Sequence, residues 1–219
     1  MPSPKRFCLA TIVLFATLAG AQTGKVEPLA GFADSNPSPE MKNALDPKGY
    51  RLSLDDGTVV CDLWLRKTIP AQPKHDVPGA LYTQIPDSAF IGVISFPQAA
   101  ADYRGQSIKA GTYALRYALL PNDGNHLGVA PNRDFLLLVP ANSDPDPAKI
   151  YKFEELVSLS RTAAGTHHPA PLSLVQSDHV VAAAFVRDDE DHWVFSVGLK
   201  LSNGDELPMA LVLKGTAPQ

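Results

Sequence analysis

The chain has 219 residues, with 19 basic and 23 acidic side chains and a formal net charge of −4 at pH 7. This length is enough for a single domain to bury a hydrophobic core. A mildly acidic chain without clusters of Lys and Arg is a poor candidate for binding nucleic acid or anionic membrane surfaces, so we expect neither partner.

The first 21 residues have the three parts of a secretory signal peptide. Lys5 and Arg6 precede an apolar run over residues 7–18, and small residues follow up to Ala21. The apolar run is shorter than the ~20 residues of a membrane-spanning helix. We predict cleavage after Ala21 and a soluble protein that is periplasmic or secreted, with an uncleaved anchor as the alternative. Loss of Lys5 and Arg6 leaves 17 basic against 23 acidic residues, a net charge of −6.

Residues 22–49 form a polar, proline-bearing stretch after the predicted cleavage site. Pro28, Pro37, Pro39 and Pro47 interrupt any long periodicity. We therefore expect an extended or partly disordered lead-in, with a short helical turn near residues 40–45.

Residues 50–216 carry mainly the patterns of β-strands and are predicted to form one domain. Asp56-Gly57 and Asn203-Gly204 are strong hairpin turn signals between apolar segments. The segments SAFIGVISF and DFLLLVP are short and apolar, as in buried strands, and KAGTYALRYALLP, HWVFSVGLKLS and ELPMALVLK alternate. Two apolar faces joined by frequent turns indicate an antiparallel β-sandwich.

One amphipathic segment interrupts the strands. Asp146-Pro147 predicts its beginning as a helix, and Gly165 predicts its end. Its apolar stripe at helical spacing consists of Ile150, Phe153, Leu156 and Val157. The predicted fold class is therefore mainly β, a single antiparallel β-sandwich with one covering α-helix.

Motifs of common enzymes and cofactor sites are absent from the sequence. It contains no G-x-S-x-G, G-x-G-x-x-G, H-E-x-x-H or C-x-x-C element. No two histidines have the spacing that places both on one face of a strand or helix. Cys61 would be the only cysteine left after signal cleavage, and its alternating apolar neighbours indicate a buried side chain, with a nucleophile or an intermolecular disulfide as the alternatives. We predict no metal site and no cofactor.

Two polar segments are the candidate ligand or partner surface. The connection over residues 121–133 is longer than a usual hairpin loop, and long loops held by a rigid scaffold are often functional. It could also be a structural loop whose Asn and Asp side chains form hydrogen bonds with its own backbone. The second segment is the His167-His168 connector after the predicted helix. The candidate residues are Asn122, Asp123, Asn125, His126, Asn132, Arg133, Asp134, His167 and His168.

The segment YRGQSIKAGTYALRYALLPNDGNHLGVAPNRDFLLLVPA resembles exported bacterial proteins of unknown function. It carries a G-x-x-I-x-A-G-x-Y-x-L element from Gly105 to Leu115, and CDLWLRK and FEELVSLSRTAAGTHHPA fit the same pattern. The resemblance covers most of the chain after the signal peptide. It implies export and a small β-sandwich, and it implies no catalytic residue.

These observations favour a non-catalytic binding or envelope-associated module. Its partner would be a small molecule, a glycan or an envelope protein. The alternative is a metal-assisted hydrolase that uses His126 with His167 or His168 and an acid such as Asp123 or Asp134. A third reading, a subunit of an export or envelope assembly, predicts an exposed apolar patch or an unprotected sheet edge.

Overall fold

The computed structural model describes residues 22–121, 130–179 and 182–217. Ten strands form one sheet in the order β1-β2-β3-β4-β7-β8-β9-β12-β11-β10, and β5 pairs separately with β6. The strands are Lys25–Leu29 (β1), Gly49–Ser53 (β2), Val59–Leu65 (β3), Phe90–Phe96 (β4), Ala100–Ala101 (β5), Ser107–Ile108 (β6), Gly111–Leu119 (β7), Asp134–Pro140 (β8), Pro171–Val175 (β9), Ala184–Arg187 (β10), Trp193–Lys200 (β11) and Glu206–Lys214 (β12).

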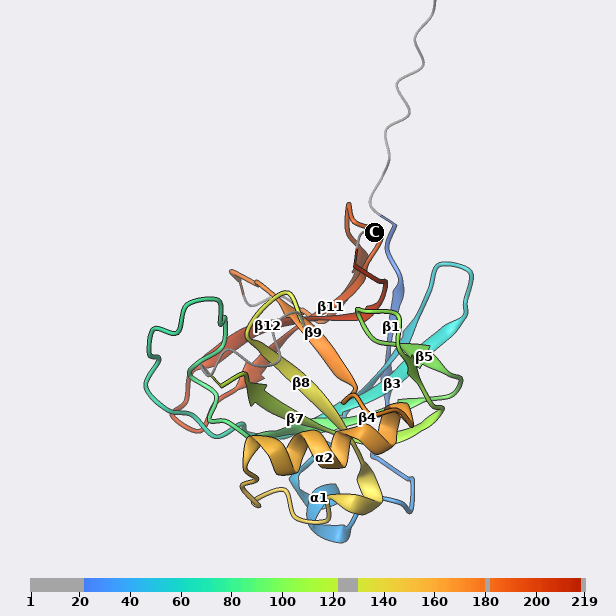
Figure 1. Cartoon of the computed structure of the whole chain (residues 1–219). Helices are drawn as coiled ribbons and strands as arrows, with labels where there is room; N and C mark the ends of the chain where they lie inside the picture. Colours follow the sequence, from blue (N-terminus) through green and yellow to red (C-terminus); the bar gives the residue numbers. More distant parts are fainter. Residues whose placement is uncertain (1–21, 122–129, 180–181, 218–219) are drawn as a thin grey trace, which may run out of the picture.

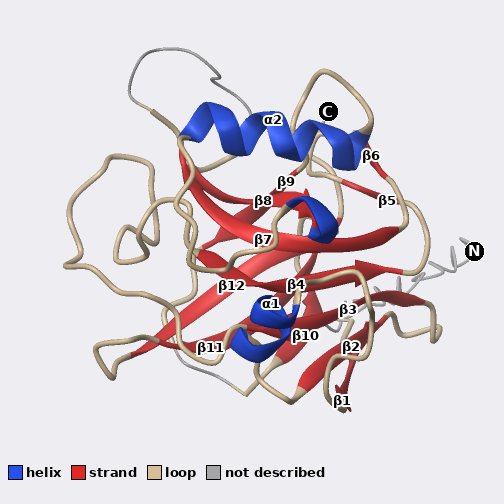
Figure 2. Cartoon of the chain, turned by 90° about the horizontal axis from the view of Figure 1, so that it is seen from below, coloured by secondary structure: helices blue, strands red, loops and turns tan. Residues whose placement is uncertain are grey.

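The large sheet curls until its two terminal strands approach each other (Figures 1 and 2). Thr23, just before β1, forms an antiparallel bridge with Val186 of β10. The Gly24 N–H donates to the Phe185 carbonyl at 2.8 Å. The predicted mainly β, antiparallel fold class is confirmed, and the facing layers belong to one sheet that is nearly closed into a barrel.

Local turn chemistry sets the two hairpins that the sequence predicts. The turn between β2 and β3 has Gly57 at φ 85°, and the turn between β11 and β12 has Gly204 at φ 93°. Both angles lie in the left-handed region, which glycine enters without a steric penalty. Register shifts at Leu52/Ser53 and Trp193/Val194 then interrupt the ladders, and such bulges bend strands and increase their twist.

The barrel interior is the main hydrophobic core. Every second residue of the strands points inward, so each strand contributes apolar side chains at alternate positions. The fully buried members include Leu63, Leu115, Leu136, Phe195 and Met209. Cys61 belongs to this core and is 0% exposed, and burial raises the pKa of its thiol far above the usual value. The expected buried cysteine is confirmed.

Two helices cover part of the outer face of the barrel. The short α1 (Pro39–Ala44) and the longer α2 (Phe153–Ala164) pack over β3, β4, β7 and β8 (Figure 2). Leu156 and Val157 of α2 are buried in this second core. Since both faces of β7 and β8 are covered, these strands are apolar on both sides.

Helix α2 begins later than the sequence predicts. The Lys152 N–H donates to the Glu155 carboxylate at 2.9 Å and caps the first turn. Asp146, the predicted cap, instead accepts the Ala148 N–H within a separate turn. Ile150 therefore lies outside the helix and is 82% exposed, so its assignment to the apolar stripe is wrong. The predicted end is confirmed, because Gly165 is left-handed at φ 67°.

The stretch 22–49 contributes elements to the fold. Strand β1 pairs along β2, from Lys25 opposite Ser53 to Leu29 opposite Gly49. Helix α1 occupies the predicted short helical turn, with the N–H of Met41 bound to the Ser38 hydroxyl at 3.1 Å. The predicted signal peptide lies outside the described residues.

Candidate functional site

In the described part of the predicted loop, Asn132 and Arg133 bind backbone carbonyls of neighbouring segments. The Asn132 side chain donates to the Leu174 carbonyl of β9 at 2.8 Å. The Arg133 N–H donates to the Gly79 carbonyl at 2.7 Å, and its guanidinium donates to the Leu120 carbonyl. The other candidates in this loop, Asn122, Asp123, Asn125 and His126, lie outside the described residues.

Asp134 is a buried carboxylate whose oxygens are occupied. It is 0% exposed and accepts the N–H groups of Leu81, at 2.9 and 3.0 Å, and of Tyr82, at 2.7 Å. It also accepts the Tyr117 hydroxyl at 3.1 Å. Burial, followed by the Asp134 charge, raises the pKa of Tyr117 well above its usual range. Asp134 thus fixes residues 81–82 to β8, and this use competes with any role as a metal ligand or base.

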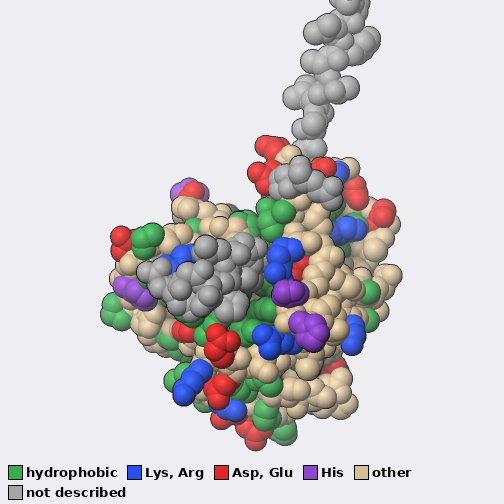
Figure 3. Space-filling view, in the orientation of Figure 1, with side chains coloured by type: hydrophobic (Ala, Val, Ile, Leu, Met, Phe, Trp, Pro, Cys, Tyr) green, Lys and Arg blue, Asp and Glu red, His purple; other side chains and the backbone are tan. Residues whose placement is uncertain are grey.

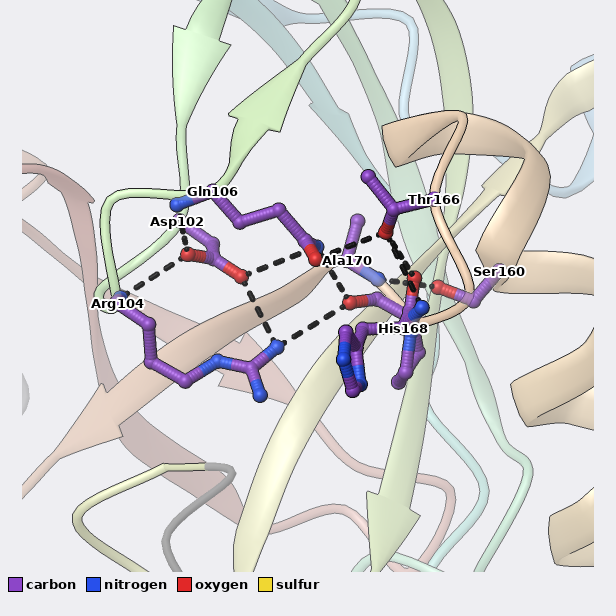
Figure 4. A network of polar contacts seen from close by, with 8 residues as sticks. Asp102, Arg104, Gln106, Ser160, Thr166, His168 and Ala170 are labelled. Atoms are coloured by element: carbon purple, nitrogen blue, oxygen red, sulfur yellow. Dashed lines mark hydrogen bonds and ion pairs between the residues drawn. The ribbon is translucent and has the colours of Figure 1, made fainter.

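The His167-His168 connector rests on the turn over residues 102–106 (Figure 4). The Thr166 hydroxyl donates to the side-chain Oε1 of Gln106 at 2.9 Å, and the side-chain Nε2 of Gln106 donates to the Pro169 carbonyl at 2.8 Å. Arg104 reaches the same Pro169 carbonyl at 3.5 Å. Contacts from residues far away in sequence therefore determine the position of the connector.

The carboxylate of Asp102 binds backbone N–H groups of this turn and so fixes its shape. Its carboxylate is 1% exposed and accepts the N–H groups of Arg104 at 3.0 Å and Gln106 at 2.8 Å. It also pairs with the Arg104 guanidinium at 3.3 Å. The side chains of His167 and His168 stay exposed above this network.

A second cation lies at the end of α2. The Lys109 N–H donates to the Ala163 carbonyl at 3.2 Å. Its Nζ lies so near Gly165 that a Cβ on that glycine would be 2.7 Å away. A lysine at a helix C-terminus also interacts favourably with the helix dipole. We call Arg104, Lys109, His167 and His168 the connector surface. Figure 3 shows histidine side chains gathered between Lys and Arg on this face of the molecule.

Several donors on the connector surface have no partner within the described part of the chain. The Nε and Nη1 groups of Arg104 and the Nζ of Lys109 have neither a hydrogen bond nor an ion pair there. The Arg104 side chain is 29% exposed, and Lys109 is exposed. The two histidines were predicted as site residues, whereas Arg104, Gln106 and Lys109 were not, although all three lie in or beside the Gly105–Leu115 element.

A second charged cluster, also missed from the sequence, lies under the segment before α2. Arg116 of β7 and Asp144 are both 0% exposed and form a bidentate pair, with both N···O distances at 2.7 Å. Arg116 also donates to the carbonyls of Ser88, Lys149 and Asp146. A lone arginine in the apolar segment TYALRYALL was the available signal.

Among the described residues, no group of three or more His, Cys, Asp or Glu side chains could hold a metal ion. Within the same residues, Ile150 is the one large hydrophobic side chain that is exposed. None of the helices in this part of the chain has the length and apolar character needed to cross a membrane.

Comparisons with known proteins give no relative. No protein-family model matches the chain, and no curated protein or solved structure is significantly similar to it. The geometry of the described residues is thus the basis for any functional assignment.

Proposed function

We propose that the protein is an exported, non-catalytic binding module that holds an anionic ligand on the connector surface. The observation that carries this proposal is the pair of cations, Arg104 and Lys109, with unpartnered side-chain donors among the described residues, beside the connector that carries two exposed histidines. The buried Asp102 pairs with the Arg104 side chain, and the backbone N–H of Lys109 is bonded to the end of α2. The export of the protein rests on the signal-peptide pattern of residues 1–21.

Positively charged donors without a partner among the described residues favour an anion over a neutral ligand. A guanidinium presents five donors in a planar fork that matches carboxylate and phosphate groups. Among the described residues Arg104 uses only Nη2, at 3.3 Å from Asp102 and 3.5 Å from Pro169, so its Nε and Nη1 donors remain for a ligand. The histidine rings can add donors from the same side. Figure 4 shows the His168 ring on the Arg104 side of the connector.

The positions of the acids favour binding over hydrolysis. The hydrolase alternative requires an acid beside the connector histidines, and Asp134 was the described candidate. Its carboxylate already accepts hydrogen bonds from the N–H groups of Leu81 and Tyr82 and from the Tyr117 hydroxyl. Asp102, the acid in the turn that contacts the connector, is buried and bound to that turn. Neither carboxylate is placed to activate a water molecule at the surface.

Calorimetric titration of the mature protein with inorganic phosphate, citrate and polygalacturonate tests this proposal. We expect at least one of these anions to bind, and more weakly at 200 mM than at 20 mM salt, because salt screens exposed charges at about these concentrations. Arg104→Ala combined with Lys109→Ala should weaken binding about tenfold or more. Lys25→Ala combined with Lys214→Ala removes the same charge from exposed strand positions and should change binding little. Equal losses in both pairs, or no binding of any anion, would contradict the proposal.

A further inference from the structure

His192, directly before β11, is a buried histidine outside the connector surface. The residue is 3% exposed, and its ring lies against the C-terminal segment over residues 215–217. A Cβ on Gly215 would lie 2.5 Å from the Cδ2 atom of the ring, so the ring fits only because this position is a glycine. The ring therefore packs closely on the segment that follows β12.

Both ring nitrogens of His192 face acceptors. Nε2 lies 3.1 Å from the Thr216 carbonyl oxygen, and Nδ1 lies 3.3 Å from a carboxylate oxygen of Asp188. Carbonyl and ionised carboxylate oxygens accept hydrogen bonds and donate none. A neutral imidazole has a single N–H and the imidazolium has two, so only the protonated ring can donate to both oxygens.

The titratable groups that face the ring come from two segments. From its own turn, the carboxylates of Asp188 and Glu190 lie 3.3 and 3.7 Å from Nδ1. From the turn over residues 102–106, the Tyr103 ring packs with its centre 5.2 Å from that of His192. Burial, followed by the charges of Glu190 and Asp188, raises the pKa of Tyr103, so its phenol stays neutral at neutral pH. The charged groups that contact the ring within the described residues are thus both negative, and they favour a positive ring.

The segment that His192 holds also braces the turn that carries Arg104. The Ala217 N–H donates to the Tyr103 carbonyl at 2.7 Å. On the other side of Arg104, a Cβ on Gly105 would lie 3.7 Å from Thr216 Cγ2, which is ordinary van der Waals contact. The same turn contacts the connector on its opposite side (Figure 4).

We infer that His192 is a pH-sensitive latch that holds the C-terminal segment on the turn over residues 102–106. The doubly protonated ring joins Asp188 to Thr216. When the ring gives up one proton to solvent, the remaining N–H stays with the carboxylate, because charge-assisted hydrogen bonds are the stronger ones. Nε2 then presents a lone pair to the Thr216 carbonyl, and the segment is released.

The sign of this effect follows from the two charge states. Histidine changes charge between about pH 5 and 8. The latch is closed on the acidic side of this range, and its hold on the segment is lost as pH rises. It requires no ligand on the connector surface, so the latch and the proposed function can fail independently.

Nuclear magnetic resonance of the isotope-labelled mature protein tests the latch at about pH 5.5 and about pH 8, near the two ends of this range. Long-range proton–nitrogen correlations should show two ring protons on His192 at the lower pH and one, on Nδ1, at the higher pH. The protection of the Ala217 amide from hydrogen exchange, relative to an unstructured peptide at the same pH, should fall about tenfold, the scale of losing one hydrogen bond to a charged group. Amides of the β11–β12 ladder should keep their protection.

Three variants separate the latch from other effects of pH. His192→Gln carries an amide that does not titrate, so the protection of Ala217 should be equal at both pH values. His75→Gln replaces an exposed histidine in the segment after β3 and should keep the wild-type pH dependence. Asp188→Asn retains an oxygen for the N–H groups of Glu190 and His192 but removes the charge, so release should move to lower pH.

Three results would overturn the inference. The first is an Ala217 protection that is the same at both pH values in the wild type. The second is a loss of protection in His192→Gln as large as in the wild type. The third is a His192 ring with a single proton at the lower pH.

Discussion

Arg116 and Arg104 occupy comparable positions, since each pairs with a buried aspartate and ties a distant segment to the sheet. Their surroundings differ. All five donors of Arg116 are bonded within the protein, and the side chain is 0% exposed. Its guanidinium carbon also lies 5.5 Å from the Phe90 ring centre and 5.2 Å from that of Tyr151. Arg104 has free donors and is partly exposed.

The difference separates a charged side chain that stabilises the fold from one that can bind a ligand. A buried ion pair is tolerated only when hydrogen bonds satisfy the remaining donors and acceptors, as they do around Arg116 and Asp144. Such a cluster has nothing left to offer a ligand. A cation that is fixed from one side and open on the other can bind a ligand without moving. Arg104 is therefore the candidate for ligand binding, and the more deeply buried Arg116 is not.

Removing one partner of the buried pair should give the largest effect. Arg116→Met leaves the Asp144 carboxylate buried without its counter-ion, and breaking such a pair costs about 3–5 kcal/mol. We expect urea unfolding, followed by tryptophan fluorescence, to show a loss of this size in the free energy of unfolding.

The double variant Arg116→Met with Asp144→Leu sharpens this test. Because it removes both charges, it should recover part of the stability lost by the single variant. A single variant that unfolds within about 1 kcal/mol of the wild type would mean that the pair is weakly coupled to the fold.

The ionisation of buried tyrosines should change the stability of the fold less than the loss of the Arg116–Asp144 ion pair does. Burial is the first cause that raises the pKa of all six tyrosines, and it raises the pKa of Tyr82 to about 12 from a usual 10.0. Between pH 10.0 and 12 the unfolded chain loses the Tyr82 proton and the folded chain keeps it. The stability of the fold should therefore decrease as pH rises through this range.

Ultraviolet absorbance titration measures this directly. The native protein should ionise its tyrosines above the usual range, and urea should return them to about pH 10. Tyr82→Phe should remove one late-ionising group from the native curve. Native and unfolded curves that coincide would show that the tyrosines are not held in buried sites.

Sequence patterns predicted the features of this fold that depend on neighbouring residues. The turns at Gly57 and Gly204, the cap at Gly165 and most strands follow from local residue preferences. Strands β1 and β9 were not predicted, since Pro28 and Pro171 interrupt the strand pattern and their partners are distant.

The candidate site was only partly predictable for the same reason. His167 and His168 stand out as a polar pair, but the contacts that position their connector come from Gln106 and Arg104, 63 and 65 residues from Pro169. Arg116 reaches Asp144 across 28 residues. No local pattern encodes such pairings.

Arg104→Ala should have the smallest effect on stability. Its ion pair with Asp102 has one partly exposed partner, and pairs of this kind contribute about 0–1 kcal/mol. The backbone N–H bonds from residues 104 and 106 to Asp102 survive the substitution, so the turn should keep its shape. We expect urea unfolding within about 1 kcal/mol of the wild type, while anion binding falls about tenfold. Asp102→Ala, which removes the acceptor of both N–H groups, should destabilise the protein more than Arg104→Ala does. If Arg104→Ala destabilised the protein as much as Arg116→Met, Arg104 would belong to the structural class, and its free donors would no longer argue for a ligand.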